Sequence, residues 1–287
     1  MHSVTRHALL WPFVALLVAG CGDDESPHRT APARPETIKL RHGFKVGQEL
    51  RYDSRTVERT AVEVTIDMRS RWHVVKARPD GAEIEVTIER YSQRVFPPLE
   101  KTPPDVAKLN KGLSGARFRL AVSTDGRHVE HLGHEGVPQV SEFSIEGLRT
   151  TLASHILKLP EEPVRAGQRW TTKTLPPPDA GPGGVTSRSQ WRVLSIQQRG
   201  GLRMVELVCL ATMEPGPLHV DGVLVKTKTE FHYAYLWNDT EGILESLTSK
   251  GSTTTLSEPL PDAGPDAGGK ASATQHIDYE ASVKLLR

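Results

Sequence analysis

Apolar and polar residues alternate along much of the chain, with the period of two that is typical of β-strands with one solvated face. Between residues 62 and 74 apolar side chains fall on even positions, and the alternation returns at Ile84, Val86 and Ile88. Asp80-Gly81 stands between these runs and predicts a tight hairpin, because Gly adopts the positive φ that such turns require. The two runs are therefore predicted to be neighbouring antiparallel strands.

The same pattern predicts further strands over the rest of the chain. They lie at 117–124, 127–133, 185–198, 202–213, 219–237, 243–256 and 271–286. As one flat strand, 219–237 would reach about 60 Å, so we expect it to bend or to carry a bulge. Its apolar residues on one parity are Val223, Val225, Phe231, Tyr233, Tyr235 and Trp237. The Pro, Asp, Ala and Gly tracts at 176–182 and 261–268 are predicted to be mobile hairpin tips.

Two segments follow helical rather than strand spacing. An amphipathic helix is predicted at about 143–158, after candidate caps Ser141 and Ser144 and before Pro160. A shorter helix is predicted from 104 to 111. Their apolar faces need a surface to cover, and the inner, concave face of the sheet is the obvious one. The helical spacing of the longer segment is carried by Ile145, Leu148, Leu152, Ile156 and Leu159.

Three landmarks recur at nearly constant offsets, which indicates a duplication. Residues 46–48 recur at 166–168, residues 71–74 at 190–193, and the turn at 125–126 at 241–242. The predicted fold is mainly β with one or two helices: a long curved antiparallel sheet, or half-barrel, from two tandem meanders. Repeat one would cover about 38–140 and repeat two about 160–287, in one domain. Trp72 and Trp191 would then hold equivalent places on the apolar face, where we expect them to pack in the core rather than to stack on a ligand.

The N-terminus has the features of a lipoprotein signal peptide. Arg6 precedes a short apolar stretch that begins at Ala8 and ends in Leu17-Val18-Ala19-Gly20-Cys21. The stretch is too short to span a bilayer, and small residues precede the cysteine. This segment resembles the lipobox of bacterial lipoproteins, which implies cleavage after residue 20 and acylation of Cys21. Each buried methylene of an acyl chain contributes roughly 0.8 kcal/mol, so a multiply acylated cysteine is a durable membrane anchor.

Residues 21–37 are polar and rich in proline, as expected for a disordered tether between the anchor and the domain at 38–287. Gly22 follows the cysteine, and the aspartates come one and two places later. In the enterobacterial sorting rule an aspartate directly after the lipidated cysteine retains a lipoprotein in the inner membrane. That resemblance favours the outer membrane, on its periplasmic or surface face.

Charge and cysteine content narrow the classes of function. Without residues 1–20 the chain has 35 Lys and Arg against 35 Asp and Glu, and no basic run, so nucleic acid is not an expected partner. With Cys21 acylated, Cys209 is the one remaining thiol, so no disulfide within the chain is expected. Its apolar neighbours at 205–211 indicate a buried small hydrophobe rather than a nucleophile.

Few residues of the sequence are candidates for a catalytic or metal-binding site. The segment from His128 to Glu135 holds three imidazoles and two carboxylates, but strand geometry places His128 and His131 on opposite faces, so we predict no metal site. Glu161 and Glu162 follow a proline, where we expect solvent-exposed charges rather than a functional pair of acids. The chain has no serine nucleophile elbow, His-Glu-x-x-His motif or phosphate-binding Gly loop, so neither an enzyme nor a cofactor is expected.

The lipobox, the tether and the Val-Arg-Ala-Gly-Gln-Arg-Trp segment at 164–170 resemble uncharacterised bacterial lipoproteins, and the Pro-Asp-Ala-Gly tracts resemble those of myxobacteria. More loosely, a long curved sheet covered by helices is similar to the LolA/LolB-type half-barrel carriers, whose members hold acyl chains in a concave apolar cavity. That resemblance implies no particular site residue here, because no functional motif matches.

Two hypotheses follow. The domain binds a lipid or another apolar ligand in the concave face of its sheet, beneath the 143–158 helix. Alternatively, the space is filled, and the protein is a structural or interaction module with a protein partner in the cell envelope. A continuous apolar cavity under the helix would favour the first hypothesis, and a filled space the second.

Overall fold

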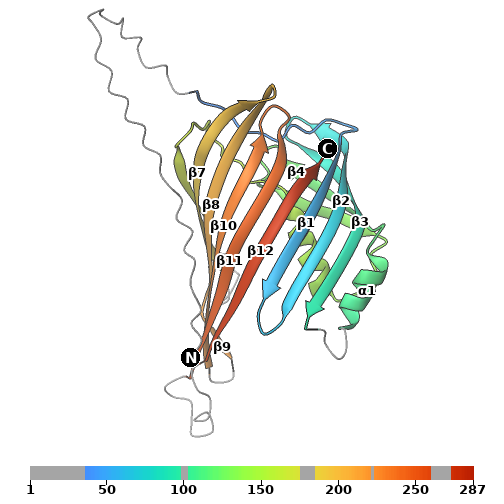
Figure 1. Cartoon of the computed structure of the whole chain (residues 1–287), viewed down its shortest axis with the longest axis vertical. Coiled ribbons are helices and arrows are strands. Elements are labelled where there is room, and N and C mark those ends of the chain that lie inside the picture. Colours follow the sequence, from blue (N-terminus) through green and yellow to red (C-terminus); the bar gives the residue numbers. More distant parts are fainter. Residues whose placement is uncertain (1–35, 98–102, 175–184, 221–222, 260–272) are drawn as a thin grey trace, which may run out of the picture. The chain divides into compact units, whose positions relative to one another are not determined.

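Strands account for most of the computed structural model, which describes residues 36–97, 103–174, 185–220, 223–259 and 273–287 (Figure 1). The first meander contains β1 (Glu49–Arg59), β2 (Glu63–Arg78), β3 (Gly81–Phe96), β4 (Arg117–Ser123) and β5 (Val129–Glu135). The second contains β6 (Arg169–Thr174), β7 (Val185–Arg199), β8 (Leu202–Pro215), β9 (Leu218–Val220), β10 (Val223–Asn238), β11 (Ile243–Pro259) and β12 (Ala273–Leu286). The predicted mainly β fold is confirmed.

All of these strands belong to one antiparallel sheet in the order β5-β4-β3-β2-β1-β12-β11-β10-β8-β7-β6, with β9 paired to β10. The two meanders meet where β1 pairs with β12, from Arg51 opposite Leu286 to Arg59 opposite Asp278. Within the described residues β5 and β6 do not pair with each other, so the sheet is open, as expected for a half-barrel.

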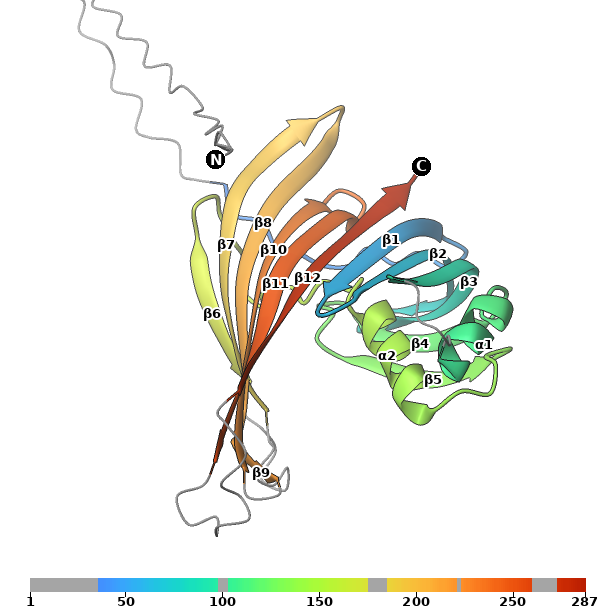
Figure 2. The same cartoon turned by 60° about the horizontal axis from the view of Figure 1, so that its bottom comes forward.

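Directly paired residues of an antiparallel sheet share a face, and successive residues alternate between faces. One face, here called the inner face, carries Trp72, Val86 and Leu120 and packs against the helices; the other is the outer face. The two helices are α1 (Pro104–Gly112) and α2 (Glu142–Ala153), and Figure 2 shows both beside the first meander. No helix among the described residues is long and apolar enough to cross a membrane.

The central helix is shorter than predicted. α2 begins after Ser141, whose hydroxyl accepts from the Ser144 N–H, but it ends at Ala153 rather than near 158. The N–H groups of His155 and Ile156 still bond locally, to the Leu152 and Ala153 carbonyls, but the Leu159 N–H donates to the distant Asp125 carbonyl at 2.7 Å. Ile156 and Leu159 are still buried, so the apolar spacing correctly identified inward-facing residues but not their conformation. The predicted helix at 104–111 is confirmed as α1.

The segment 219–237 is not one strand. β9 pairs back on β10, with Val220 opposite Val223, so the chain reverses direction between them. The expected irregularity is present near the far end of β10, where the register with β11 shifts between Leu236 and Trp237.

The two meanders begin with the same turn. The N–H of Gly47 donates to the Val74 carbonyl and that of Gly167 to the Val193 carbonyl, both at 2.9 Å, and the two glycines have φ of 78° and 79°. A register shift follows directly after Val74 in β2 and after Val193 in β7. These matches agree with the predicted tandem repeats. In space each meander runs the same way along the sheet, with β12 as the additional strand between them.

Candidate ligand-binding groove

The space beneath the central helix is almost filled. Only about 30 Å³ is open between the inner face and the end of α2, where Tyr52, Trp72 and His155 meet. A space of that size holds about one water molecule and no acyl chain. The predicted apolar cavity under the 143–158 helix is therefore absent from this part of the sheet, because the side chains that line it pack together into the core.

Two buried histidines lie at this filled space. His42 is stacked on Phe44 and meets the edge of Trp237, and its Nε2 lies 2.9 Å from the Leu157 carbonyl. The Nδ1 of His155 lies 2.9 Å from the Thr151 carbonyl, while its Nε2 is buried without a partner among the described residues. Burial lowers the pKa of both imidazoles to about 4. Both are therefore neutral members of the core.

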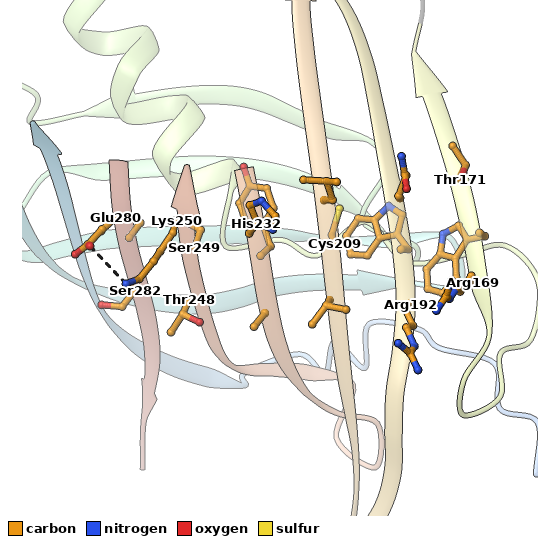
Figure 3. A pocket seen from close by; sticks show the side chains of 18 of the residues that line it. Arg169, Thr171, Arg192, Cys209, His232, Thr248, Ser249, Lys250, Glu280 and Ser282 are labelled. Carbon is orange, nitrogen blue, oxygen red and sulfur yellow. Dashed lines mark ion pairs between the residues drawn. The ribbon is translucent and has the colours of Figure 1, made fainter. Parts of the chain in front are cut away.

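A much larger hollow lies on the outer face of the second meander, with a volume of about 830 Å³ (Figure 3). We call it the outer groove. Each of β6, β7, β8, β10, β11 and β12 contributes three consecutive residues to its lining, and β1 contributes Arg55 and Val57. The middle residue of each triplet points to the inner face, so the two flanking side chains form the groove. Its volume is within the range of ligand sites, roughly 300 to 1,000 Å³.

Two rows of paired side chains run across the outer groove. The first row is Val57, Glu280, Lys250, His232, Leu210, Gln190 and Thr171. The second row is Arg55, Ser282, Thr248, Ala234, Val208, Arg192 and Arg169. The centre of both rows is apolar at Val208, Leu210 and Ala234, and polar and charged groups surround it. This is the composition of a site for a ligand with an apolar part.

Charge is distributed unevenly between the two ends of the outer groove. At the β12 end Glu280 accepts ion pairs from Lys250 at 3.6 Å and from Arg59 at 3.5 Å. At the β6 end Arg169 stands directly opposite Arg192, and neither forms an ion pair with another described residue. Of the two ends of the outer groove, only the β6 end therefore presents positive charge without an ion-pair partner among the described residues.

The inner face of the same meander carries a continuous run of aromatic rings, here called the aromatic run. Adjacent ring centroids lie 5.6 to 5.9 Å apart, and the first two rings are nearly parallel. Most of the rings are only half-buried. The run consists of Trp170, Trp191, Tyr235, Tyr233, Phe231 and Tyr279. Gly251 makes room for Phe231, whose ring lies where a β-carbon on that residue would be.

The other residues that the sequence analysis singled out have structural roles. Trp72 and Trp191 are both buried in the core, as expected. Cys209 is buried between strands, and burial raises the pKa of its thiol to about 12. A thiol with that pKa is not a nucleophile at neutral pH, so its predicted role as a small hydrophobe agrees with the structure. Glu161 is exposed and pairs with Arg127.

The cluster from His128 to Glu135 lies in and beside β5. A register shift near Gly133 brings His131 and His134 to the same face, with their rings 5.5 Å apart and both about 6.0 Å from the Phe118 ring. His128 precedes the strand. Among the described residues no group of three metal-binding side chains is close enough to hold an ion. Cys21, the tether to residue 35 and the two Pro-Asp-Ala-Gly tracts lie outside the described residues.

The outer groove was not predicted from the sequence, because its lining belongs to the more polar face of seven strands and depends on the register between them. One signal was present. β8 is apolar on both parities at 207–211, which is unusual for a strand with one wet face. Val208 and Leu210 are the outer members of that run and lie at the centre of the groove.

No protein-family model and no curated protein matches this chain. Among solved structures it is similar to one described as lipid-protein interactions in lipovitellin, with a TM-score of 0.46 and 14% identity. The match covers 85% of this chain and 25% of the other, so the chain spans about a quarter of that protein's length.

Proposed function

We propose that this protein is a lipid-anchored envelope protein without enzymatic activity that binds a lipid or another apolar ligand in its outer groove. The single observation that carries the proposal is the groove itself, a hollow of about 830 Å³ with an apolar centre on a face that carries charged residues elsewhere. The sequence predicted a ligand beneath the central helix, where the structure leaves only about 30 Å³. The outer groove has the volume that such a ligand needs.

The anchor is tested first. Cys21→Ser should leave an uncleaved precursor without acyl chains, because the thiol is the acceptor and the residue after the cut. Gel mobility and metabolic labelling with a fatty acid would measure this in the native host. Cys209→Ser is the matched control and should be processed and labelled normally. Normal processing and labelling of Cys21→Ser would contradict the predicted lipobox.

Ligand binding is tested with lysophosphatidylcholine below its critical micelle concentration. The protein would be the chain from residue 21 onward with Cys21→Ser, since the whole core lies within residues 36–287. Leu210→Asn should weaken binding about tenfold, because roughly 1 to 2 kcal/mol of apolar contact is lost. Native mass spectrometry and titration calorimetry would measure the affinity.

Leu236→Asn is the matched control, since Leu236 is a half-buried leucine on the outer face of β10 that does not line the groove. It should leave the affinity unchanged. Absence of binding by the unsubstituted chain, or an equal loss in both variants, would contradict ligand binding in the outer groove.

A second candidate is an envelope interaction module, favoured by the filled space under α2 and by the half-buried aromatic run. In this case a protein partner covers the inner face. A photo-crosslinking amino acid in place of Tyr279 should then capture one partner in stoichiometric yield from intact membranes, while the same amino acid at exposed Val185 should not. Repeated failure at Tyr279 would exclude this candidate.

A further inference from the structure

Four cations stand together on the outer face of β6 and β7, and we call them the cationic quartet. Arg169 and Lys173 lie on β6, and they are directly opposite Arg192 and Arg188 on β7. All four are exposed. Cross-strand partners on one face have β-carbons roughly 4.5 to 5.5 Å apart, so the quartet forms two like-charge pairs, with the Thr171–Gln190 pair in the row between them.

Like charges directly opposite each other destabilise a strand pair. Two lysines elsewhere on this face are compensated: Lys226 pairs with Glu258 and Lys228 with Glu230, both at 3.0 Å. No member of the cationic quartet has an ion pair within the described part of the chain. The quartet is therefore a place on this sheet where an anion from outside the chain would remove an unfavourable interaction.

Protection of an exposed edge does not account for this arrangement. β6 is the last strand of the sheet order, and charged side chains on an edge strand discourage pairing with other molecules. Arg169 and Lys173 on β6 are sufficient for that purpose. Arg188 and Arg192 lie on β7, which is paired on both sides, so edge protection gives no reason for cations there.

The quartet surrounds two neutral hydrogen-bonding groups. Thr171 and Gln190 are paired between the two like-charge pairs, and both line the outer groove and a second hollow of about 520 Å³ next to it. One carboxylate, Glu214, also lines the second hollow, together with Lys173, Arg188 and Lys228. It lies opposite Thr186, beyond the quartet, and pairs with none of these cations.

We infer that the ligand of the outer groove is an anionic amphiphile, whose phosphate or carboxylate head binds the cationic quartet while its apolar part lies over Val208, Leu210 and Ala234. This inference rests on the proposed function and adds the chemical class of the ligand. Guanidinium groups suit phosphate and carboxylate because they donate two parallel hydrogen bonds. The Thr171 hydroxyl and the Gln190 amide add neutral donors between them.

The test compares lysophosphatidylglycerol, lysophosphatidylcholine with the same acyl chain, and inorganic phosphate, on the chain from residue 21 with Cys21→Ser. The anionic lysolipid should bind about tenfold more tightly than the zwitterionic one. Arg169→Gln with Arg192→Gln should abolish this preference and leave the affinity for lysophosphatidylcholine within about twofold. The control is Lys226→Gln, which removes a cation of the same face that is paired with Glu258 and lies outside the groove, and it should preserve the preference.

The possible failures are distinguishable. Equal binding of both lysolipids would overturn the inference that the ligand has an anionic head group, and it would leave the proposed function standing. Binding of neither lysolipid would overturn the proposed function itself. Binding of phosphate as tight as that of the anionic lysolipid would overturn the inference that the ligand is an amphiphile, and it would indicate a site for free anions. A preference that survives the double substitution would overturn the assignment to the quartet.

Discussion

Acidification from pH 7 to pH 4 should lower the free energy of unfolding by about 6 kcal/mol through His42 and His155 alone. Each has a folded pKa of about 4 against an ordinary value of 6.5, so the unfolded chain binds more protons between these values. The contribution of the two neutral histidines to the free energy of unfolding is therefore fully present above about pH 6.5 and is lost as the pH falls toward 4. Each histidine contributes about 3 kcal/mol, which is large against the total stability of a domain.

The structure explains why protonation is costly. Both carbonyls that face the Nδ1 of His155 can only accept, so this nitrogen carries the proton of the neutral ring. The second proton would go to Nε2, which is buried without a partner among the described residues. Protonation would thus place a charge and an unsatisfied donor between Tyr52 and Trp72.

His155→Phe separates this effect from other acid-sensitive groups. Hydrogen bonds and ion pairs lower the pKa of Asp53 and Asp105, so carboxylates also destabilise the fold in acid. The substitution should remove about half of the histidine contribution, or about 3 kcal/mol between pH 6.5 and 4. Denaturant unfolding at several pH values measures this difference. The matched control is exposed His128→Phe, and the same pH dependence in both variants would contradict the prediction.

Gly242→Ala and Gly126→Ala should each destabilise the fold by at least about 4 kcal/mol. Both glycines have positive φ, +66° and +68°, and both touch backbone of a distant segment. A β-carbon on Gly242 would lie 2.1 Å from the Gly43 nitrogen, and one on Gly126 would lie 2.3 Å from the Leu157 carbonyl oxygen. Because backbone cannot move aside as a flexible side chain can, the packed connections would have to separate.

Gly47→Ala and Gly167→Ala are the controls within the same chain. Their φ values are +78° and +79°, but no atom lies within 4 Å of the added carbon. Each should therefore cost only the conformational strain, about 1 to 2 kcal/mol. Chemical denaturation of the four variants would measure the separation. Equal losses in all four would show that the close approaches near Gly126 and Gly242 contribute nothing.

The periodicity of the sequence predicted most strands because one face of each is buried. β1 and β6 were missed, because their inner positions include polar residues such as Ser54, Thr56 and Thr172, which weakens the alternation. The recurrence of residues 46–48 at 166–168 could be found in the sequence, because it lies in short local segments. The outer groove and the cationic quartet could not be found there, because they depend on which strands become neighbours and in which register.

The strand that joins the meanders is the last of the twelve along the chain. Each meander is built mostly from strands that follow one another, so it can form its hairpins soon after they leave the ribosome or the export channel. The pairing of β1 with β12 cannot form until residues 273–286 have been synthesised, because Arg51 pairs with Leu286 and Arg59 with Asp278. During that interval both edges that this pairing joins are open to other chains. Joining of the two halves is therefore the step at which misassembly competes with folding.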